Sequence, residues 1–284
     1  MGKIFVTGAT GTNGKALVEA LLKKNADFVV GSRNVAEAQR ILDQAVDIRR
    51  FDFSDATTYT EIGKEIDKVF LLGPPLTLKV DELINPFLDF LKSKKITRVV
   101  YFSAMAADKM GTKLDFHTKI EQKLKDDNFD YTILKPSFFA QNFKNYESEN
   151  ILERNIVFMP AGNGKAGFVD VKDIAAVAAV TLTTEGHTKK TYELTGPELL
   201  SYKEVASLLS EVLHKEIIYP NPSVDQFKEV LQNAGAPAFI GEYLSNVYQV
   251  IANNEVNYVT NDVESITGKK PTALKEVITR DFLS

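Results

Sequence analysis

Residues 3–14, Lys-Ile-Phe-Val-Thr-Gly-Ala-Thr-Gly-Thr-Asn-Gly, decide the fold of this chain. The apolar run Ile4–Val6 predicts a buried strand, and the residues after the stretch have the apolar spacing of a helix. Between them lie three glycines, Gly8, Gly11 and Gly14, which can bend sharply or meet another backbone closely because they lack a Cβ. The stretch therefore predicts a strand–turn–helix unit of an α/β protein.

The same turn has the chemistry of an anion site. Backbone N–H groups at the start of a helix, together with the helix dipole, attract negative charge. In this GxxGxxG spacing, Gly8 is expected to make the turn, Gly11 to admit a pyrophosphate, and Gly14 to let the helix pack on the strand. We therefore predict a dinucleotide-binding site, with a structural glycine turn as the alternative. Its expected residues are Gly8, Thr10, Gly11, Thr12, Asn13 and Gly14.

The end of the second expected strand, Phe28–Val30, predicts which dinucleotide binds. A site that prefers NAD usually places a carboxylate here, which bonds the adenosine ribose. This chain has Gly31, Ser32 and then Arg33, which leave room and positive charge for the 2′-phosphate of NADP(H). We predict NADP(H) over NAD(H), with Ser32 and Arg33 as ligands; the alternative for Arg33 is a solvated loop cation.

Strands and helices alternate through the first half of the chain. The later strands expected in this half are Asp47–Phe51, Val69–Leu72, Arg98–Phe102 and Tyr131–Leu134. Such alternation predicts a doubly wound parallel sheet of the Rossmann type with right-handed crossovers. We assign residues 1–150 to this NAD(P)-binding domain and 151–284 to a smaller C-terminal α/β lobe that binds substrate. Part of 151–195 is allowed to return to the main sheet.

The C-terminal region is expected to be less regular. We expect a helix over Phe143–Asn150 and short strands at Ile156–Phe158, Thr191–Leu194 and Glu216–Tyr219. Ser201 and Glu204 have the spacing of a capping box, which predicts that a helix starts there.

Further ligand contacts are expected at strand ends, because open parallel sheets bind ligands outside the carboxyl ends of their strands. Asp52 is expected to accept a hydrogen bond from the adenine, with Phe53 covering the ring. Otherwise Asp52 is a loop carboxylate beside Ser54 or Asp55, one of which caps the next helix. The remaining predicted cofactor contacts are Leu72, Gly73, Pro74, Ser103 and Pro136.

The composition excludes several classes of protein. The 284 residues carry a net charge of −4 with both signs interspersed, so we expect no direct nucleic-acid binding. There is no cysteine, and no His/Asp/Glu cluster has metal-ligand spacing, so we expect neither a disulfide nor a metal site. The first strand is expected within three residues of the N-terminus, and no apolar run approaches the ~18–20 residues of a membrane helix. We therefore expect a cytoplasmic protein.

Four motifs together resemble the NmrA-like family of atypical short-chain dehydrogenases/reductases, over essentially the full chain. They are Val6–Gly14, Gly31–Arg33, Phe168–Ile174 and Tyr192–Pro197. The likeness is strongest to the branch of NAD(P)H-dependent quinone reductases and triphenylmethane reductases. It implies a Rossmann fold and a nicotinamide cofactor. The same family also contains regulators that bind a dinucleotide without catalysis.

The helix before the sixth strand departs from ordinary short-chain dehydrogenases. Those enzymes carry Tyr-x-x-x-Lys there, whereas this chain carries His117 and Glu121, which lie one helical turn apart on one face. The pattern resembles the quinone-reductase branch and argues against alcohol dehydrogenation. We predict His117 as the catalytic residue, as a proton donor or as a bond to the nicotinamide ribose. A structural histidine is the alternative.

We predict a reductase that transfers hydride from NADPH to a quinone-like or conjugated aromatic acceptor. Such an acceptor is already electrophilic, so it needs cofactor geometry and an apolar slot. The rival prediction is a non-catalytic NADP(H)-sensing regulatory protein that acts through a protein partner; a homodimer is also left open. The substrate-side candidates, for which packing in the core is the alternative, are Phe138, Phe139, Asn142 and Phe168.

Overall fold

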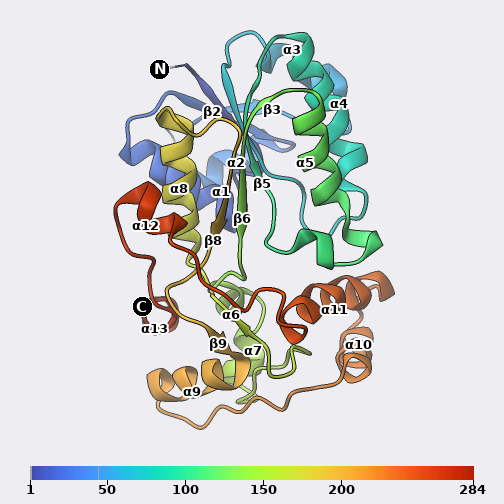
Figure 1. Cartoon of the computed structure of the whole chain (residues 1–284), viewed down its shortest axis with the longest axis vertical. Coiled ribbons are helices and arrows are strands. Elements are labelled where there is room, and N and C mark those ends of the chain that lie inside the picture. The colour runs from blue at the N-terminus through green and yellow to red at the C-terminus, as the bar shows by residue number, and fades with distance from the viewer. Residues whose placement is uncertain (1, 44) are drawn as a thin grey trace. The chain divides into compact units, whose positions relative to one another are not determined.

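The computed structural model describes residues 2–43 and 45–284 (Figure 1). The strands are β1 (Ile4–Val6), β2 (Phe28–Ser32), β3 (Asp47–Arg50), β4 (Lys68–Leu71), β5 (Arg98–Phe102), β6 (Asp130–Pro136), β7 (Lys165–Ala166), β8 (Lys190–Leu194) and β9 (Leu200–Ser201). The α-helices are α1 (Thr12–Lys23), α2 (Val35–Ile41), α3 (Tyr59–Ile62), α4 (Val80–Ser93), α5 (Phe116–Asp126), α6 (Asn142–Asn145), α7 (Ser148–Leu152), α8 (Val171–Thr183), α9 (Tyr202–Leu213), α10 (Val224–Asn233), α11 (Ala238–Ala252), α12 (Asp262–Thr267) and α13 (Leu274–Leu283). Short 3-10 turns are η1 (Ala56–Thr58), η2 (Ala107–Lys109) and η3 (Thr112–Leu114).

A seven-stranded sheet has the order β3-β2-β1-β4-β5-β6-β8. The ladders from β3 across to β6 are parallel, with Val6 beside Val30 on one side and beside Phe70 on the other. The central strands β1 and β4 are buried along their whole length, because helices cover both faces of a parallel sheet. Strand order reverses between β1 and β4, which is where such sheets bind their ligands. The predicted doubly wound Rossmann fold is confirmed.

Two compact units share the chain. Unit 1 comprises Met1–Ala104, Phe116–Lys135 and Val171–Glu193, and unit 2 comprises Met105–Asp115, Pro136–Asp170 and Leu194–Ser284. The units therefore alternate along the chain, whereas the division at residue 150 has a single boundary and stays a prediction. In unit 1, α8 packs against α1, and β8 lies beside β6 in the main sheet.

An aromatic layer fills the α4 side of unit 1 and explains one small residue. Phe5, Phe51 and Phe87 meet edge to face, with the ring centroids of Phe51 and Phe87 separated by 4.9 Å. A Cβ on Gly31 would lie 2.5 Å from Phe5 Cζ and 2.8 Å from Phe51 Cβ. Packing against these two rings therefore requires a glycine at position 31, whereas its predicted role beside a 2′-phosphate stays a prediction.

Two of the strands expected in unit 2 are absent from the described residues. Ile156–Phe158 and Glu216–Tyr219 form only an isolated parallel bridge between Ile156 and Ile218. Two backbone hydrogen bonds hold it, from Val157 N to Ile218 O and from Ile218 N to Asn155 O. Ile218 is 52% exposed, so one face of the segment that was expected to be a strand is in contact with solvent.

The helix expected over Phe143–Asn150 is divided into α6 and α7. The break comes at Glu147, whose buried carboxylate accepts hydrogen bonds from Phe158 N at 3.1 Å and Asn150 Nδ2 at 3.1 Å. The backbone N–H of Phe158, which is distant in sequence, therefore pairs with the Glu147 carboxylate at the bend between α6 and α7. The capping box predicted at Ser201 and Glu204 is confirmed at the start of α9.

Candidate active site

The glycine turn between β1 and α1 needs glycine at two of its three positions. Gly8 has φ +67°, a conformation that other residues rarely adopt. A Cβ on Gly14 would lie 2.1 Å from Gly8 O and 2.6 Å from Ala9 Cα, so the helix packs directly on the turn. Gly11 is different, since its Cβ would meet Gly8 O at an ordinary 3.6 Å. Its lack of a side chain keeps the approach to the helix start open.

Helix α1 begins at Thr12, one turn earlier than the expected start at Lys15. Within the described chain Gly11 gives this helix no side-chain cap, and Gly8, Gly11 and Thr12 are exposed at the turn. Asn13 Oδ1 is buried and has no hydrogen-bond partner among the described residues. An acceptor left in this state is costly unless a donor reaches it. The backbone N–H groups at the start of α1 therefore fit an anionic ligand, whereas the Asn13 oxygen needs a separate hydrogen-bond donor.

Thr7 locks the turn to the neighbouring strand, a contact that sequence reasoning missed. Its Oγ1 donates towards Phe70 O at 3.2 Å and Leu72 O at 3.0 Å, and accepts from Leu72 N at 2.8 Å. These bonds join the carboxyl ends of β1 and β4. A buried hydroxyl directly after an apolar strand was the signal that could have found it.

The carboxyl ends of β2 and β3 gather the residues predicted for the adenosine end. Ser32 Oγ is engaged locally with the backbone of Asn34, and Arg33 is exposed. Hydrogen bonds from the backbone and the hydroxyl of Ser54 lower the pKa of Asp52, with smaller contributions from nearby Arg33 and Arg50. Asp52 is therefore a charged turn residue, with a cation on either side.

Neighbouring residues of this loop show the capping role, whereas contact of Phe53 with an adenine stays a prediction. Asp55 caps η1 through a bond from Thr57 N at 3.1 Å, as the capping alternative predicts. The ring of Phe53 is half-buried and lies edge-on to Phe51 at a centroid distance of 4.8 Å. Contact with Phe51 in the aromatic layer thus holds the ring of Phe53 in place.

The loop after β4 leaves Leu72, Gly73 and Pro74 half-buried. A Cβ on Gly73 would lie 2.7 Å from Val80 Cγ1, so α4 packs against this loop. Pro136 is buried at the end of β6, where its carbonyl accepts a hydrogen bond from Met105 N at 3.0 Å.

A polar cluster connects β5, α5 and β6 in unit 1. The hydroxyl of Tyr101 lies 2.7 Å from Nδ1 of His117. One turn further along α5, buried Glu121 accepts a hydrogen bond from Ser103 Oγ at 2.6 Å and pairs with Lys135 Nζ at 2.9 Å. The predicted residues His117 and Ser103 are thus brought to one cluster. Tyr101 and Lys135 were missed, because their partners are distant in sequence.

Glu121 has each carboxylate oxygen bound to a different neighbour. Among the described residues Glu121 therefore has a structural role, linking α5 to Ser103 after β5 and to Lys135 on β6. Burial lowers the pKa of His117 to about 3, and the positive charge of Lys135 acts in the same direction. The ring is neutral at pH 7, so the imidazolium form expected of a proton donor is disfavoured.

We expect acid to destabilise the protein through His117. The unfolded histidine binds a proton near pH ~6.5, whereas the folded ring stays neutral down to a pKa of about 3. Because the unfolded state binds more protons in this window, stability falls as the pH is lowered through it and is unaffected above it. Urea unfolding at about pH 7 and about pH 5 measures the effect. A His117→Gln variant should lose less stability between the two conditions; an equal loss would assign the effect to other groups.

The predicted substrate-side residues lie in unit 2 and differ in environment. Phe138 is half-buried and stacks on Tyr248, with centroids 6.0 Å apart and planes at 27°. Phe168 is 3% exposed and packs against Phe143 and Tyr202, which is the core role named as the alternative. Phe139 forms a parallel bridge with Val169. Asn142 starts α6 and is half-buried.

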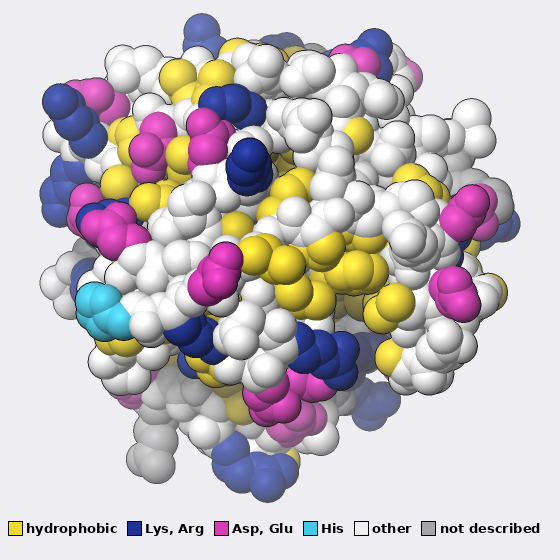
Figure 2. All heavy atoms as spheres, turned by 90° about the horizontal axis from the view of Figure 1, so that it is seen from below, with side chains coloured by type: hydrophobic (Ala, Val, Ile, Leu, Met, Phe, Trp, Pro, Cys, Tyr) yellow, Lys and Arg dark blue, Asp and Glu magenta, His cyan; other side chains and the backbone are white. Residues whose placement is uncertain are grey.

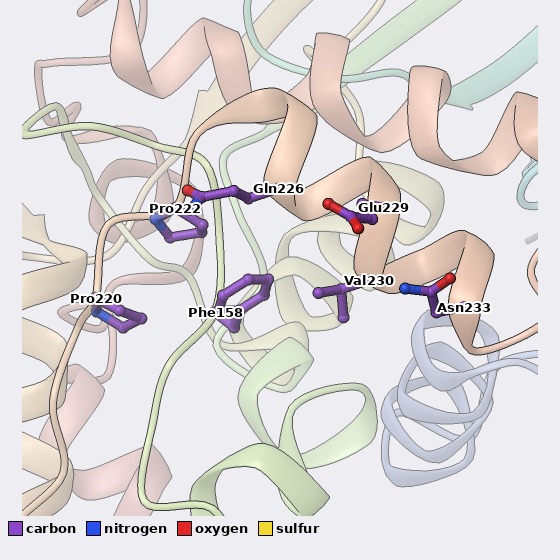
Figure 3. Close-up of a pocket in the computed structure, with 7 residues that line it drawn as sticks. All are labelled: Phe158, Pro220, Pro222, Gln226, Glu229, Val230 and Asn233. Atoms are coloured by element: carbon purple, nitrogen blue, oxygen red, sulfur yellow. The ribbon is translucent and has the colours of Figure 1, made fainter.

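A separate surface pocket of about 380 Å³ lies in unit 2 beside α10 (Figure 3). Phe158 and Val230 supply apolar side chains to it, and Val230 projects from α10 together with Gln226 and Glu229 (Figure 3). Figure 2 shows one face of the molecule on which apolar side chains gather between acidic and basic ones. Phe158 belongs to the expected strand Ile156–Phe158, and none of the pocket residues was predicted as a site residue.

The described residues hold no group of His, Asp or Glu side chains that could bind a metal ion. Among those same residues, every helix is too short or too polar to cross a bilayer.

A doubly wound sheet with a glycine turn at its switch point defines an NAD(P)-binding oxidoreductase of the Rossmann class. The profile of the NmrA-like family matches residues 1–282, and the chain belongs to this family. The resemblance stated from the motifs is confirmed.

Individual relatives are reductases. An NADPH-dependent quinone oxidoreductase from Escherichia coli, solved with NADPH, is 25% identical with a TM-score of 0.89, over 98% of this chain and 99% of the other. Triphenylmethane reductase from Citrobacter, solved with NADP(H), is 26% identical with a TM-score of 0.89, over 98% and 100%. An NAD(P)H azoreductase from Xenophilus azovorans is 27% identical over 96% of both chains.

Proposed function

We propose that this protein is an NADPH-dependent reductase that transfers hydride to a quinone-like or conjugated aromatic acceptor. The observation that carries the proposal is the turn from Gly8 to Gly14, whose exposed start of α1 suits a pyrophosphate. The relatives that act on quinones, azo compounds and triphenylmethane dyes support the acceptor class. Their acceptors share a conjugated system that takes up hydride.

The chain's own residues would hold the cofactor in three places. The start of α1 would bind the pyrophosphate, Arg33 would bind the 2′-phosphate, and Asp52 with Phe53 would contact the adenine. When bound, NADPH supplies the hydride. The protein therefore needs to bind the cofactor and the acceptor, orient them towards each other and exclude water. We propose that the acceptor binds beside Phe138, Phe139, Asn142 and Phe168. Among them Phe138, which stacks on Tyr248, offers the best-placed aromatic surface.

Turnover with NADPH tests the proposal directly. We expect purified protein to oxidise NADPH in the presence of quinones, azo dyes or triphenylmethane dyes, followed by the loss of absorbance of the reduced cofactor. Absence of turnover with every acceptor, despite tight NADPH binding, would overturn it. In that case, a strong preference for one redox state of the cofactor and capture of a protein partner would favour the NADP(H)-sensing regulator.

Arg33→Ala is expected to remove the preference for NADPH. A charge-assisted bond to phosphate contributes about 1.5–3 kcal/mol, so the dissociation constant for NADPH should rise about 10- to 100-fold while that for NADH changes little. Titration of both cofactors by calorimetry measures the two constants. Arg40→Ala is the matched control, because Arg40 is also an exposed cation but lies in the last turn of α2. Equal losses for NADPH and NADH would show that Arg33 does not bind the 2′-phosphate.

A further inference from the structure

His117 is held by its Nδ1 atom. The Tyr101 hydroxyl lies 2.7 Å from this nitrogen, and Tyr101 is 1% exposed within β5. The neighbouring ring of Phe116 lies against the imidazole, with centroids 4.5 Å apart. Among the described residues, no hydrogen bond reaches Nε2 of His117. The ring is therefore fixed on one side and has its second nitrogen available on the other.

Burial, together with the positive charge of Lys135, lowers the pKa of His117 and keeps the imidazole from taking up a proton. Lys135 on β6 faces the cluster with a positive charge, and Glu121 on α5 pairs with that lysine and accepts a hydrogen bond from Ser103. The carboxylate that could have stabilised an imidazolium is thus already occupied. A neutral imidazole has one N–H donor and one acceptor nitrogen, so its tautomer decides what it can bind.

The stronger acid donates to the stronger base in such a pair. A phenol is a far better proton donor than a neutral imidazole N–H, and an imidazole nitrogen is a better acceptor than a phenol oxygen. The bond is therefore O–H of Tyr101 to Nδ1 of His117, which leaves the hydrogen of the ring on Nε2. The partner of one nitrogen sets the state of the other.

We propose that Tyr101 is a positioning residue that holds His117 in its Nε2–H tautomer, so that His117 meets a bound ligand as a hydrogen-bond donor. The recipient would be an oxygen of the ligand, and that part rests on the proposed reductase function. In reduction of a quinone-like acceptor, negative charge develops on oxygen as hydride arrives, and a neutral donor stabilises it without giving up its proton. The proton that completes the product then comes from solvent.

Nitrogen NMR of the full-length protein labelled in its three histidines tests the tautomer directly. We expect His117 to show a protonated Nε2 and an unprotonated Nδ1 at neutral pH. In Tyr101→Phe, which conserves the volume of the ring, we expect a mixture of tautomers at His117. A protonated Nδ1 in the unmodified protein, or an unchanged tautomer in Tyr101→Phe, would overturn the proposal. The measurement on the unmodified protein stands even where the variant does not fold.

Tyr192→Phe is the matched control. Tyr192 makes the same kind of bond to another histidine, with its hydroxyl 2.9 Å from Nδ1 of His187. This variant should change the signals of His187 and leave those of His117 unchanged.

Kinetics give a second readout. Tyr101→Phe should lower kcat for a quinone about 10-fold with little change in KM for NADPH. An unchanged kcat would show that the Nε2–H of His117 does not assist the reduction as a hydrogen-bond donor. If no acceptor is reduced by the unmodified protein, the proposed function fails, while the NMR result still decides the tautomer.

Discussion

Gly14→Ala should abolish cofactor binding and weaken the fold together. The added Cβ would lie 2.1 Å from Gly8 O, and both atoms belong to backbone that has no room to move apart without shifting α1. Overpacking of this kind costs about 1–3 kcal/mol of folding stability. Because the shift also moves the N–H groups at the start of the helix, we expect NADPH affinity to fall by about 100-fold or more. Urea unfolding and cofactor titration measure the two effects.

Gly11→Ala separates the two roles of glycine in the turn. Its Cβ would make only an ordinary 3.6 Å contact with Gly8 O, so stability without ligand should stay within about 0.5 kcal/mol. Its side chain would nevertheless stand where the pyrophosphate is expected to approach, so NADPH affinity should fall. If Gly11→Ala bound NADPH normally, the proposed position of the pyrophosphate would be wrong.

Asp170→Ala should give the largest loss of stability in unit 2. The carboxylate of Asp170 is 1% exposed and binds Arg280 Nη1 at 2.7 Å and Gln141 Nε2 at 2.9 Å. Its removal leaves the Arg280 guanidinium and the buried Gln141 amide without this partner. Breaking a buried pair costs about 3–5 kcal/mol, and we expect about 3 because the Arg280 side chain is 33% exposed. Urea unfolding measures the loss, and hydrogen exchange should show faster opening of α13.

The same helix supplies a matched control for this ion pair. Lys275 on α13 pairs with Glu211 at 2.6 Å, but their side chains are 51% and 61% exposed. Glu211→Ala should therefore cost less than about 1 kcal/mol. Similar losses for Asp170→Ala and Glu211→Ala would show that burial of the Asp170 pair is not what stabilises unit 2.

Regular alternation predicted the Rossmann sheet well, since its central strands, such as β1 and β4, are buried along their length and read as short apolar runs. The same reasoning failed at Ile156–Phe158 and Glu216–Tyr219, which form only one bridge although Val157 and Ile217 are buried. It could not show that Gly31 is also required by packing, because Phe5 and Phe51, which leave no space for a Cβ there, are distant in sequence.

The sequence alone determined what depends on neighbouring residues. Glycines at Gly8 and Gly14 and a turn before a helix are requirements of local backbone geometry, so spacing was enough to find them, while the cap was narrowed only to Ser54 or Asp55. Only the tertiary structure decided the state of His117. Its partner Tyr101 and the charge of Lys135 reach it from two different strands, and hydrogen bonding and desolvation depend on distance in space rather than along the chain.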